Sequence, residues 1–163
     1  LNDIKKTPID LKILEKKLPK KCKAVQYKYL KGKSRGDVFN GVEGLVVLIP
    51  KRGSKVGHFI ALIPRRHHIE YFSSLGGSPE SELDKLGESL DIFTKLLGKN
   101  FIYNRVKLQS GKYNIKSCSS WILARLYLRK LKLRQFQGLF NRSVHLTKPD
   151  DIVSLMSLLL LST

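Results

Sequence analysis

Three short apolar runs, joined by tight turns, place the strongest limit on how this chain can fold. They span residues 45–49, 58–63 and 69–72. Each run has the length of a β-strand, and Gly and Pro residues mark the turns between them. Strands joined by connections this short run in opposite directions, so the pattern predicts an antiparallel meander at the centre of the fold.

Helical patterns flank these runs. Apolar residues recur every three or four positions from Ser78-Pro79 to Gly98, which predicts one amphipathic helix over this stretch. The same signals predict helices at residues 7–18, 117–132, 136–140 and 150–161, and strands near residues 24–29 and 100–108. At 163 residues the chain has the size of one domain. We therefore expect a single α+β domain, residues 1–163, in which a small antiparallel or mixed sheet packs against a central helix that carries Cys118.

The charge of the chain is one-sided. Lys and Arg number 31 against 13 Asp and Glu, which gives a formal net charge of +18. The cations are spread along the whole chain, which favours a folded domain with a basic surface over a basic tail. We expect double-stranded DNA as the partner, bound through its backbone without sequence preference. An anionic membrane surface and a purely solubilising charge are the alternatives.

One set of cations has helical spacing. Arg125, Arg129 and Lys132 are four and three residues apart, so a helix would place them on one stripe. We expect this stripe to bind the DNA. The alternative is an ordinary solvated helix face.

Other classes of site are disfavoured. Two cysteines, Cys22 and Cys118, are too few for a disulfide framework, which favours a reducing, intracellular setting. The apolar run at 152–161 is shorter than a bilayer-spanning helix, so no membrane partner is expected. No His, Cys, Asp and Glu residues have the spacing of a metal site, and no metal is expected.

One cysteine stands where a helix is predicted to begin. The segment Ser117-Cys118-Ser119-Ser120-Trp121 heads an apolar helical pattern, and both a helix N-terminus and an imidazolium stabilise a thiolate. His58, at the start of the second apolar run, is the candidate imidazole, and Gln109 can donate its amide N–H to a developing oxyanion. The order His58, Gln109, Cys118 therefore indicates thiol nucleophile chemistry. The alternatives are a small buried Cys118 and a solvated edge His58.

These ordered motifs resemble those of the adenovirus-type maturation proteases. The motifs are His58 before an aromatic residue, Tyr71-Phe72-Ser73-Ser74-Leu75-Gly76-Gly77, Gln109, and Ser117-Cys118-Ser119-Ser120-Trp121. The wider group includes proteases of virophages and Polinton-like elements and, more distantly, the SUMO-specific proteases. The resemblance covers residues 45–131 and implies a papain-like or adenain-like fold, in which a helix presents Cys118 to a sheet that presents His58. It also implies cleavage of viral precursor proteins, with DNA as an activator in some members.

The chain departs from the family pattern at the third catalytic position. Where the family has Asp, Glu or Asn after the Tyr-Phe pair, this chain has Ser73; Phe59 and Ser119 also replace a usual Trp and Gly. A hydroxyl cannot stabilise an imidazolium as a carboxylate does, so we expect Ser73 only to orient His58. Glu70 is near in sequence, but strand alternation directs it away from the face of Ser73 unless a bulge intervenes.

The resemblance and the residues together predict a cysteine endopeptidase that processes viral capsid or core precursor proteins, in the virion and inside the host cell. Its catalytic residues would be His58, Ser73, Gln109 and Cys118. The chemistry needs no cofactor, and DNA is a candidate activator. Two alternatives stay open: a peptidase specific for ubiquitin-like modifiers, and a non-catalytic basic protein that binds or packages DNA.

Overall fold

A five-stranded mixed sheet forms the centre of the molecule in the computed structural model, which describes residues 11–53, 57–109 and 115–141. The strands lie in the order β1 (Cys22–Gln26), β2 (Gly44–Pro50), β3 (Gly57–Pro64), β4 (Ile69–Phe72) and β5 (Phe101–Tyr103). β2, β3 and β4 form the predicted antiparallel meander, while β1 joins β2 and β5 joins β4 in parallel. The fold is of the predicted α+β class.

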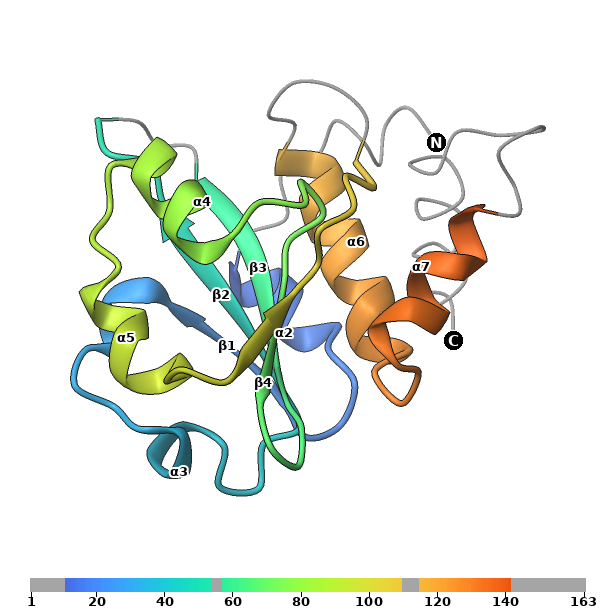
Figure 1. Cartoon of the computed structure of the whole chain (residues 1–163), viewed down its shortest axis with the longest axis horizontal. Coiled ribbons are helices and arrows are strands. Elements are labelled where there is room, and N and C mark those ends of the chain that lie inside the picture. The colour runs from blue at the N-terminus through green and yellow to red at the C-terminus, as the bar shows by residue number, and fades with distance from the viewer. Residues whose placement is uncertain (1–10, 54–56, 110–114, 142–163) are drawn as a thin grey trace.

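Helices cover both faces of the sheet, which explains why the central strands are apolar throughout. On β3, Phe59 and Ala61 pack on one face, and Ile60 and Leu62 pack on the other. The first face is covered by α2 (Leu11–Lys16), α6 (Ile115–Tyr127) and α7 (Leu133–Asn141), and the second by the 3-10 turn η1 (Tyr27–Leu30), α4 (Pro79–Leu86) and α5 (Asp91–Leu97). The short helix α3 (Arg35–Val38) lies in the connection from η1 to β2. Figure 1 shows α6 and α7 on one side of the sheet, with α4 and α5 on the other.

A glycine fixes the start of β3. A Cβ atom on Gly57 would lie 2.6 Å from the carbonyl oxygen of Ile49, so a larger residue would push β3 away from β2. In the observed register His58 pairs with Ile49. His58 has the same strand parity as Ile60 and Leu62, which face α4 and α5. The side chain of His58 therefore leaves β3 on the face of the sheet that α4 covers.

The single helix predicted between Ser78 and Gly98 is in fact two helices. Gly87 adopts a left-handed conformation with a φ of 76°, and its N–H bonds the carbonyl oxygens of Leu83 and Asp84, which ends α4. Only glycine reaches this conformation without strain. The chain then turns before α5 begins.

The helix that carries the cysteine differs from its prediction at both ends. It begins at Ile115, so Cys118 lies within the first turn rather than at the first position. It ends at Tyr127 instead of near residue 132. The side chain of Arg125 hydrogen-bonds two carbonyl groups of the turn that follows, which stabilises this early end.

The remaining elements are displaced by a few residues. The strand predicted near 24–29 spans 22–26 and continues as η1, the strand predicted at 100–108 spans only 101–103, and the helix predicted at 136–140 spans 133–141. The helix predicted at 150–161, and the start of the one predicted at 7–18, lie outside the described residues. Among the helices that are described, none is both long and apolar enough to cross a bilayer.

Candidate active site

The predicted nucleophile and base lie in contact. Cys118, in the first turn of α6, has its Sγ atom 2.9 Å from Nδ1 of His58. α6 packs along β3, and His58 reaches Cys118 from the end of that strand, of which it is the second residue. Both are almost fully buried, with exposed fractions of 3% for His58 and 2% for Cys118. The contact is therefore shielded from bulk water.

The neighbours of His58 favour its charged form. Burial by itself would lower the pKa of His58, but the Cys118 sulfur and the Glu82 carboxylate raise this pKa from 6.5 to about 10. An imidazole with such a pKa carries its proton at neutral pH. His58 can therefore act as the cationic partner of a thiolate and as a proton donor.

Ser73 contacts the far side of the imidazole. Its Oγ atom lies 2.9 Å from Nε2 of His58 and accepts a hydrogen bond of 3.3 Å from the backbone N–H of Leu75. Ser73 follows the last residue of β4 and is fully buried. Its hydroxyl is thus within hydrogen-bond distance of the ring nitrogen that faces away from Cys118.

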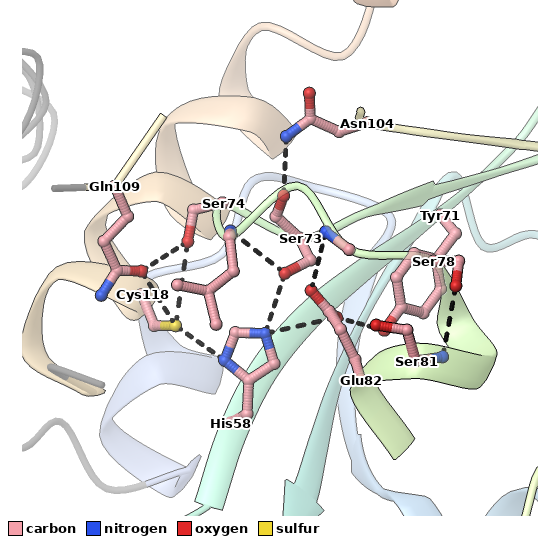
Figure 2. A network of polar contacts seen from close by, with 12 residues as sticks. His58, Tyr71, Ser73, Ser74, Ser78, Ser81, Glu82, Asn104, Gln109 and Cys118 are labelled. Carbon is pink, nitrogen blue, oxygen red and sulfur yellow. Dashed lines mark hydrogen bonds and ion pairs between the residues drawn. The ribbon is translucent and has the colours of Figure 1, made fainter. Parts of the chain in front are cut away.

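A carboxylate that we did not predict also faces Nε2. Glu82, on α4, has Oε2 3.6 Å from Nε2 of His58 and is 4% exposed. The hydroxyl of Tyr71 donates to the same oxygen at 2.6 Å, and the N–H of Gly77 donates to Oε1 at 3.3 Å. Figure 2 shows Glu82 and Cys118 on opposite sides of the imidazole ring. The available signal was the spacing of Glu82 from Leu86, which puts the carboxylate on the apolar face of the predicted helix.

Close packing on two sides requires the Gly76-Gly77 pair in the turn after β4. A Cβ atom on Gly77 would lie 2.8 Å from Cγ of Glu82. One on Gly76, whose φ is 77°, would lie 2.8 Å from the backbone nitrogen of Lys107. The two glycines therefore let the turn after β4 pass close to α4 and to the segment after β5.

Gln109 lies beside the thiol, but it presents its oxygen rather than the predicted N–H. Its Oε1 atom is 3.4 Å from Sγ of Cys118 and accepts a hydrogen bond of 2.7 Å from Oγ of Ser74. The N–H groups of Leu108 and Gln109 both bond the carbonyl oxygen of Ser74, which fixes this segment against the turn after β4. The amide points its oxygen this way because Ser74, a residue we had not assigned, supplies a donor there (Figure 2).

Asn104 connects the turn after β4 to helix α7. Its Nδ2 atom donates to the carbonyl oxygens of Ser73 at 2.7 Å and Val106 at 2.8 Å. Its Oδ1 atom accepts a hydrogen bond of 2.8 Å from Gln137 on α7. These bonds turn the chain away from β5, which explains why that strand is shorter than predicted. Sequence reasoning missed Asn104 because an Asn in a basic segment is typical of a surface turn.

The predicted DNA-binding stripe is wrong for Arg125. This residue is fully buried and bonds both carboxylate oxygens of Glu70, at 2.8 and 3.0 Å. Arg129 is directed to Glu43, with a contact of 2.7 Å. Because α6 ends before Arg129, the three cations do not share one helical stripe, and Lys132 is the exposed member. Glu70 faces α6, on the side of the sheet that strand alternation indicated.

Exposed cations gather in a different place, which we call the basic groove. It lies between the β3–β4 turn, the segment after β5 and the α6–α7 turn, and has a volume of about 850 Å³. Its exposed cations are Arg66, Arg105, Lys130, Lys132 and Arg134. Apolar atoms from Ile102, Val106 and Leu133 also line it, and the guanidinium of Arg105 lies 4.8 Å from the centre of the Tyr103 ring.

The second cysteine has a different environment. Cys22 is a free, partly buried thiol on β1. Burial raises the pKa of Cys22, an effect that nearby Arg129 partly offsets. The described parts of the chain contain no group of three His, Cys, Asp or Glu side chains that could hold a metal ion.

Comparison with known proteins finds a relative by sequence and solved structures of low similarity. No family model matches this sequence. The chain is 26% identical over 132 residues to an uncharacterised protein of the Sputnik virophage, and the match covers 72% of this chain and 75% of that protein. The resemblance to the adenovirus-type maturation proteases stays a prediction.

Solved structures that match this chain do so over most of its length but with low TM-scores. The central domain of an uncharacterised Legionella pneumophila protein has a TM-score of 0.45 at 14% identity, covering 92% of this chain and 96% of that one. The protease domain of Ulp1, in complex with Smt3, the yeast orthologue of SUMO, has a TM-score of 0.40 at 14% identity, covering 93% and 72%. The SUMO protease Ulp1 with its catalytic cysteine oxidised to a sulfinic acid has a TM-score of 0.36 at 15% identity, covering 91% and 74%.

Proposed function

We propose that this protein is a cysteine peptidase in which Cys118 is the nucleophile and His58 the general acid and base. The observation that carries the proposal is the 2.9 Å contact between Sγ of Cys118 and Nδ1 of His58 inside a buried site. Thiol nucleophiles with an imidazole at hydrogen-bond distance are the arrangement that acyl transfer requires. The opposite ring nitrogen also has polar partners, so the imidazole is held on both sides.

The first half of the reaction forms a thioester. His58 carries its proton on Nδ1, and the Cys118 thiolate beside it attacks the carbonyl carbon of the scissile peptide bond. The tetrahedral oxyanion would be stabilised by the Gln109 amide N–H, after the side-chain amide turns its nitrogen toward that oxygen. The carbon–nitrogen bond then breaks, and the proton on Nδ1 moves to the leaving amine.

The second half regenerates the enzyme. His58, now neutral, takes a proton from a water molecule as that water attacks the thioester carbon. The carbon–sulfur bond breaks, the carboxylic acid product leaves, and the thiolate again faces a protonated His58. No electron transfer or further reagent is needed.

The proposed substrates are capsid or core precursor proteins of a virus-like particle, cleaved within the particle and the host cell. The similarity to a virophage protein supports a viral setting. A peptidase for ubiquitin-like modifiers is the alternative substrate class, and the charge of +18 supports it poorly because such modifiers dock over a wide, partly apolar face.

The substrate test uses two substrate panels and a thiol-reactive probe. Wild-type protein, Cys118→Ala and Cys22→Ala are incubated with virophage capsid precursors and with precursors of ubiquitin-like modifiers. We expect wild type and Cys22→Ala to cleave the capsid precursors, and a peptide warhead to label Cys118 in preference to Cys22 by mass spectrometry. Cleavage of the modifiers alone would change the substrate class. Equal labelling of both thiols, with no cleavage, would refute the peptidase.

We further propose that the basic groove binds double-stranded DNA, which is a candidate activator of the peptidase. The five exposed cations that line the groove support this, since backbone recognition of DNA needs clustered Lys and Arg rather than a base-reading motif. The groove takes the place of the predicted stripe of Arg125, Arg129 and Lys132 as the DNA-binding surface.

Fluorescence anisotropy with random duplex DNA tests the groove. We expect binding at about 50 mM salt that weakens steeply toward physiological salt. Replacing Lys130, Lys132 and Arg134 together with Ala should flatten the salt dependence by about one unit of log–log slope per lost phosphate contact. The matched control replaces Lys20, Lys21 and Lys23, which are exposed, carry the same total charge and do not line the groove. Equal weakening in the two triple variants would rule out the groove as the site.

A further inference from the structure

We propose that Glu82 is the positioning residue that supplies the carboxylate missing from the position of Ser73. The inference rests on the proposed peptidase function. Oε2 of Glu82 lies 3.6 Å from Nε2 of His58, on the side of the ring opposite Cys118. The carboxylate thus comes from α4, a helix on one face of the sheet, instead of from the end of β4.

The surroundings of Glu82 hold its carboxylate in this position. Tyr71 donates to Oε2 at 2.6 Å and the N–H of Gly77 donates to Oε1 at 3.3 Å, so both oxygens have donors in place of water. Burial raises the pKa of Tyr71 well above its ordinary value, and the Glu82 charge adds to the rise, so Tyr71 remains a hydroxyl donor. A buried carboxylate with these two donors and a cationic partner is the kind that a folded protein tolerates.

Several charged groups around His58 affect the protonation of its imidazole. Cys118 on α6 and Glu82 on α4 favour the imidazolium, while the exposed Lys85 of α4 lines the same cavity of about 50 Å³ as His58 and Glu82. Ser73, at 2.9 Å, is neutral and cannot balance the positive ring. Glu82 is therefore the group among these that can stabilise the charge of His58 throughout the reaction, since Cys118 loses its charge when it forms the thioester.

The main experiment compares Glu82→Gln with Glu80→Gln. Both remove one charge from α4, but Glu80 is exposed and Glu82 is buried. We expect Glu82→Gln to lower kcat by about ten- to a thousandfold, which corresponds to the loss of one close opposite charge. Glu80→Gln should retain wild-type activity.

The pH profile separates a positioning role from a structural one. On the alkaline side, wild-type cleavage should decline as pH rises toward about 10, where His58 loses the proton that the leaving amine needs. Without the carboxylate the pKa of His58 falls, so Glu82→Gln should lose activity at a lower pH. A variant that merely damages the fold would lose activity at every pH alike.

Two further variants make the inference sharper. Ser73→Asp in the Glu82→Gln background places a carboxylate next to Nε2 and should restore most of the lost activity. Gly77→Ala keeps the charge but would place its Cβ atom 2.8 Å from Cγ of Glu82, so it should displace the carboxylate and lower activity. Circular dichroism and thermal melting check that each variant folds.

The outcomes distinguish the two proposals. If wild-type protein neither cleaves nor labels at Cys118, the peptidase itself is refuted. If wild type is active but Glu82→Gln has the wild-type rate and pH profile, the role of Glu82 is refuted while the peptidase stands. Failure of Ser73→Asp to rescue a folded Glu82→Gln protein would also count against a purely electrostatic role.

Discussion

Two clusters of buried charged side chains lie at opposite ends of the interface between α6 and the sheet. Near the start of α6, Cys118 contacts His58, and Glu82 faces the other side of the ring. Near the end of the same helix, Arg125 bonds both oxygens of Glu70. Both clusters join α6 to residues of the meander, yet their hydrogen bonds are completed differently.

We call the second cluster closed, because every nitrogen of its guanidinium has a hydrogen-bond partner. Nε and Nη2 of Arg125 bond Glu70, and Nη1 and Nη2 also bond the carbonyl oxygens of Leu128 and Leu131. No proton can leave this guanidinium under ordinary conditions, so the cluster serves stability. In the first cluster His58 holds a proton that it can transfer, and it contacts a nucleophilic sulfur. Buried charge alone therefore does not mark a reactive site; a transferable proton beside a nucleophile does.

The largest expected effect is the loss of peptide-bond cleavage when the thiol of the first cluster is removed. Cys118→Ala should reduce peptide-bond cleavage to background while the protein stays folded, because a small residue replaces a small one at a helix start. Cleavage of capsid precursor by gel and folding by circular dichroism check this. Persistent cleavage by Cys118→Ala would show that the nucleophile is another residue.

The closed cluster should respond in stability instead. Arg125→Met leaves Glu70 with a reduced set of partners in the core, and we expect a loss of about 3–5 kcal/mol in the free energy of unfolding. Chemical denaturation measures it. Arg129→Met is the matched control, since Arg129 pairs with the exposed Glu43, and it should cost clearly less. Equal losses of stability in the two variants would mean that burial of an ion pair does not determine how much it stabilises this fold.

The pH dependence of stability should appear in the first cluster. The pKa of His58 is raised from 6.5 to about 10, so the stabilisation from its charge is complete below about pH 6.5 and is lost as pH rises through about 10. Glu82→Gln should therefore destabilise the protein more at pH 6.5 than above pH 10. Urea titrations of wild type and Glu82→Gln at both pH values test the sign, and a larger cost at the higher pH would contradict it.

The smallest effect is expected at Ser73. If its hydroxyl only orients His58, then Ser73→Ala should lower the rate on the order of tenfold or less, as expected for one neutral hydrogen bond. Ser73→Asp in the wild-type background should raise activity or leave it unchanged. Initial rates on a peptide substrate are sufficient. A loss of several orders of magnitude in Ser73→Ala would mean that the hydroxyl, rather than Glu82, is essential.

Local patterns in the sequence were enough to predict the meander and the cysteine-bearing helix. Continuous apolar runs identified β2, β3 and β4 because those strands are buried on both faces. The order of His58, Gln109 and Cys118 identified three side chains that do lie together. Helix ends were less accurate, since a left-handed Gly87 and the side chain of Arg125 decide where α4 and α6 stop.

Two features could be decided only by the tertiary structure. Glu82 reaches His58 because the start of β3 faces α4, and no spacing along the chain encodes the distance between a strand and a helix packed on it. Arg125 is buried because Glu70 of β4 faces α6, so a cation with surface spacing became part of the core. The sequence by itself determined where the three central strands lie and which thiol, imidazole and amide are available. Packing across the two faces of the sheet determined which carboxylate meets which cation, because ion pairs depend on distance in space.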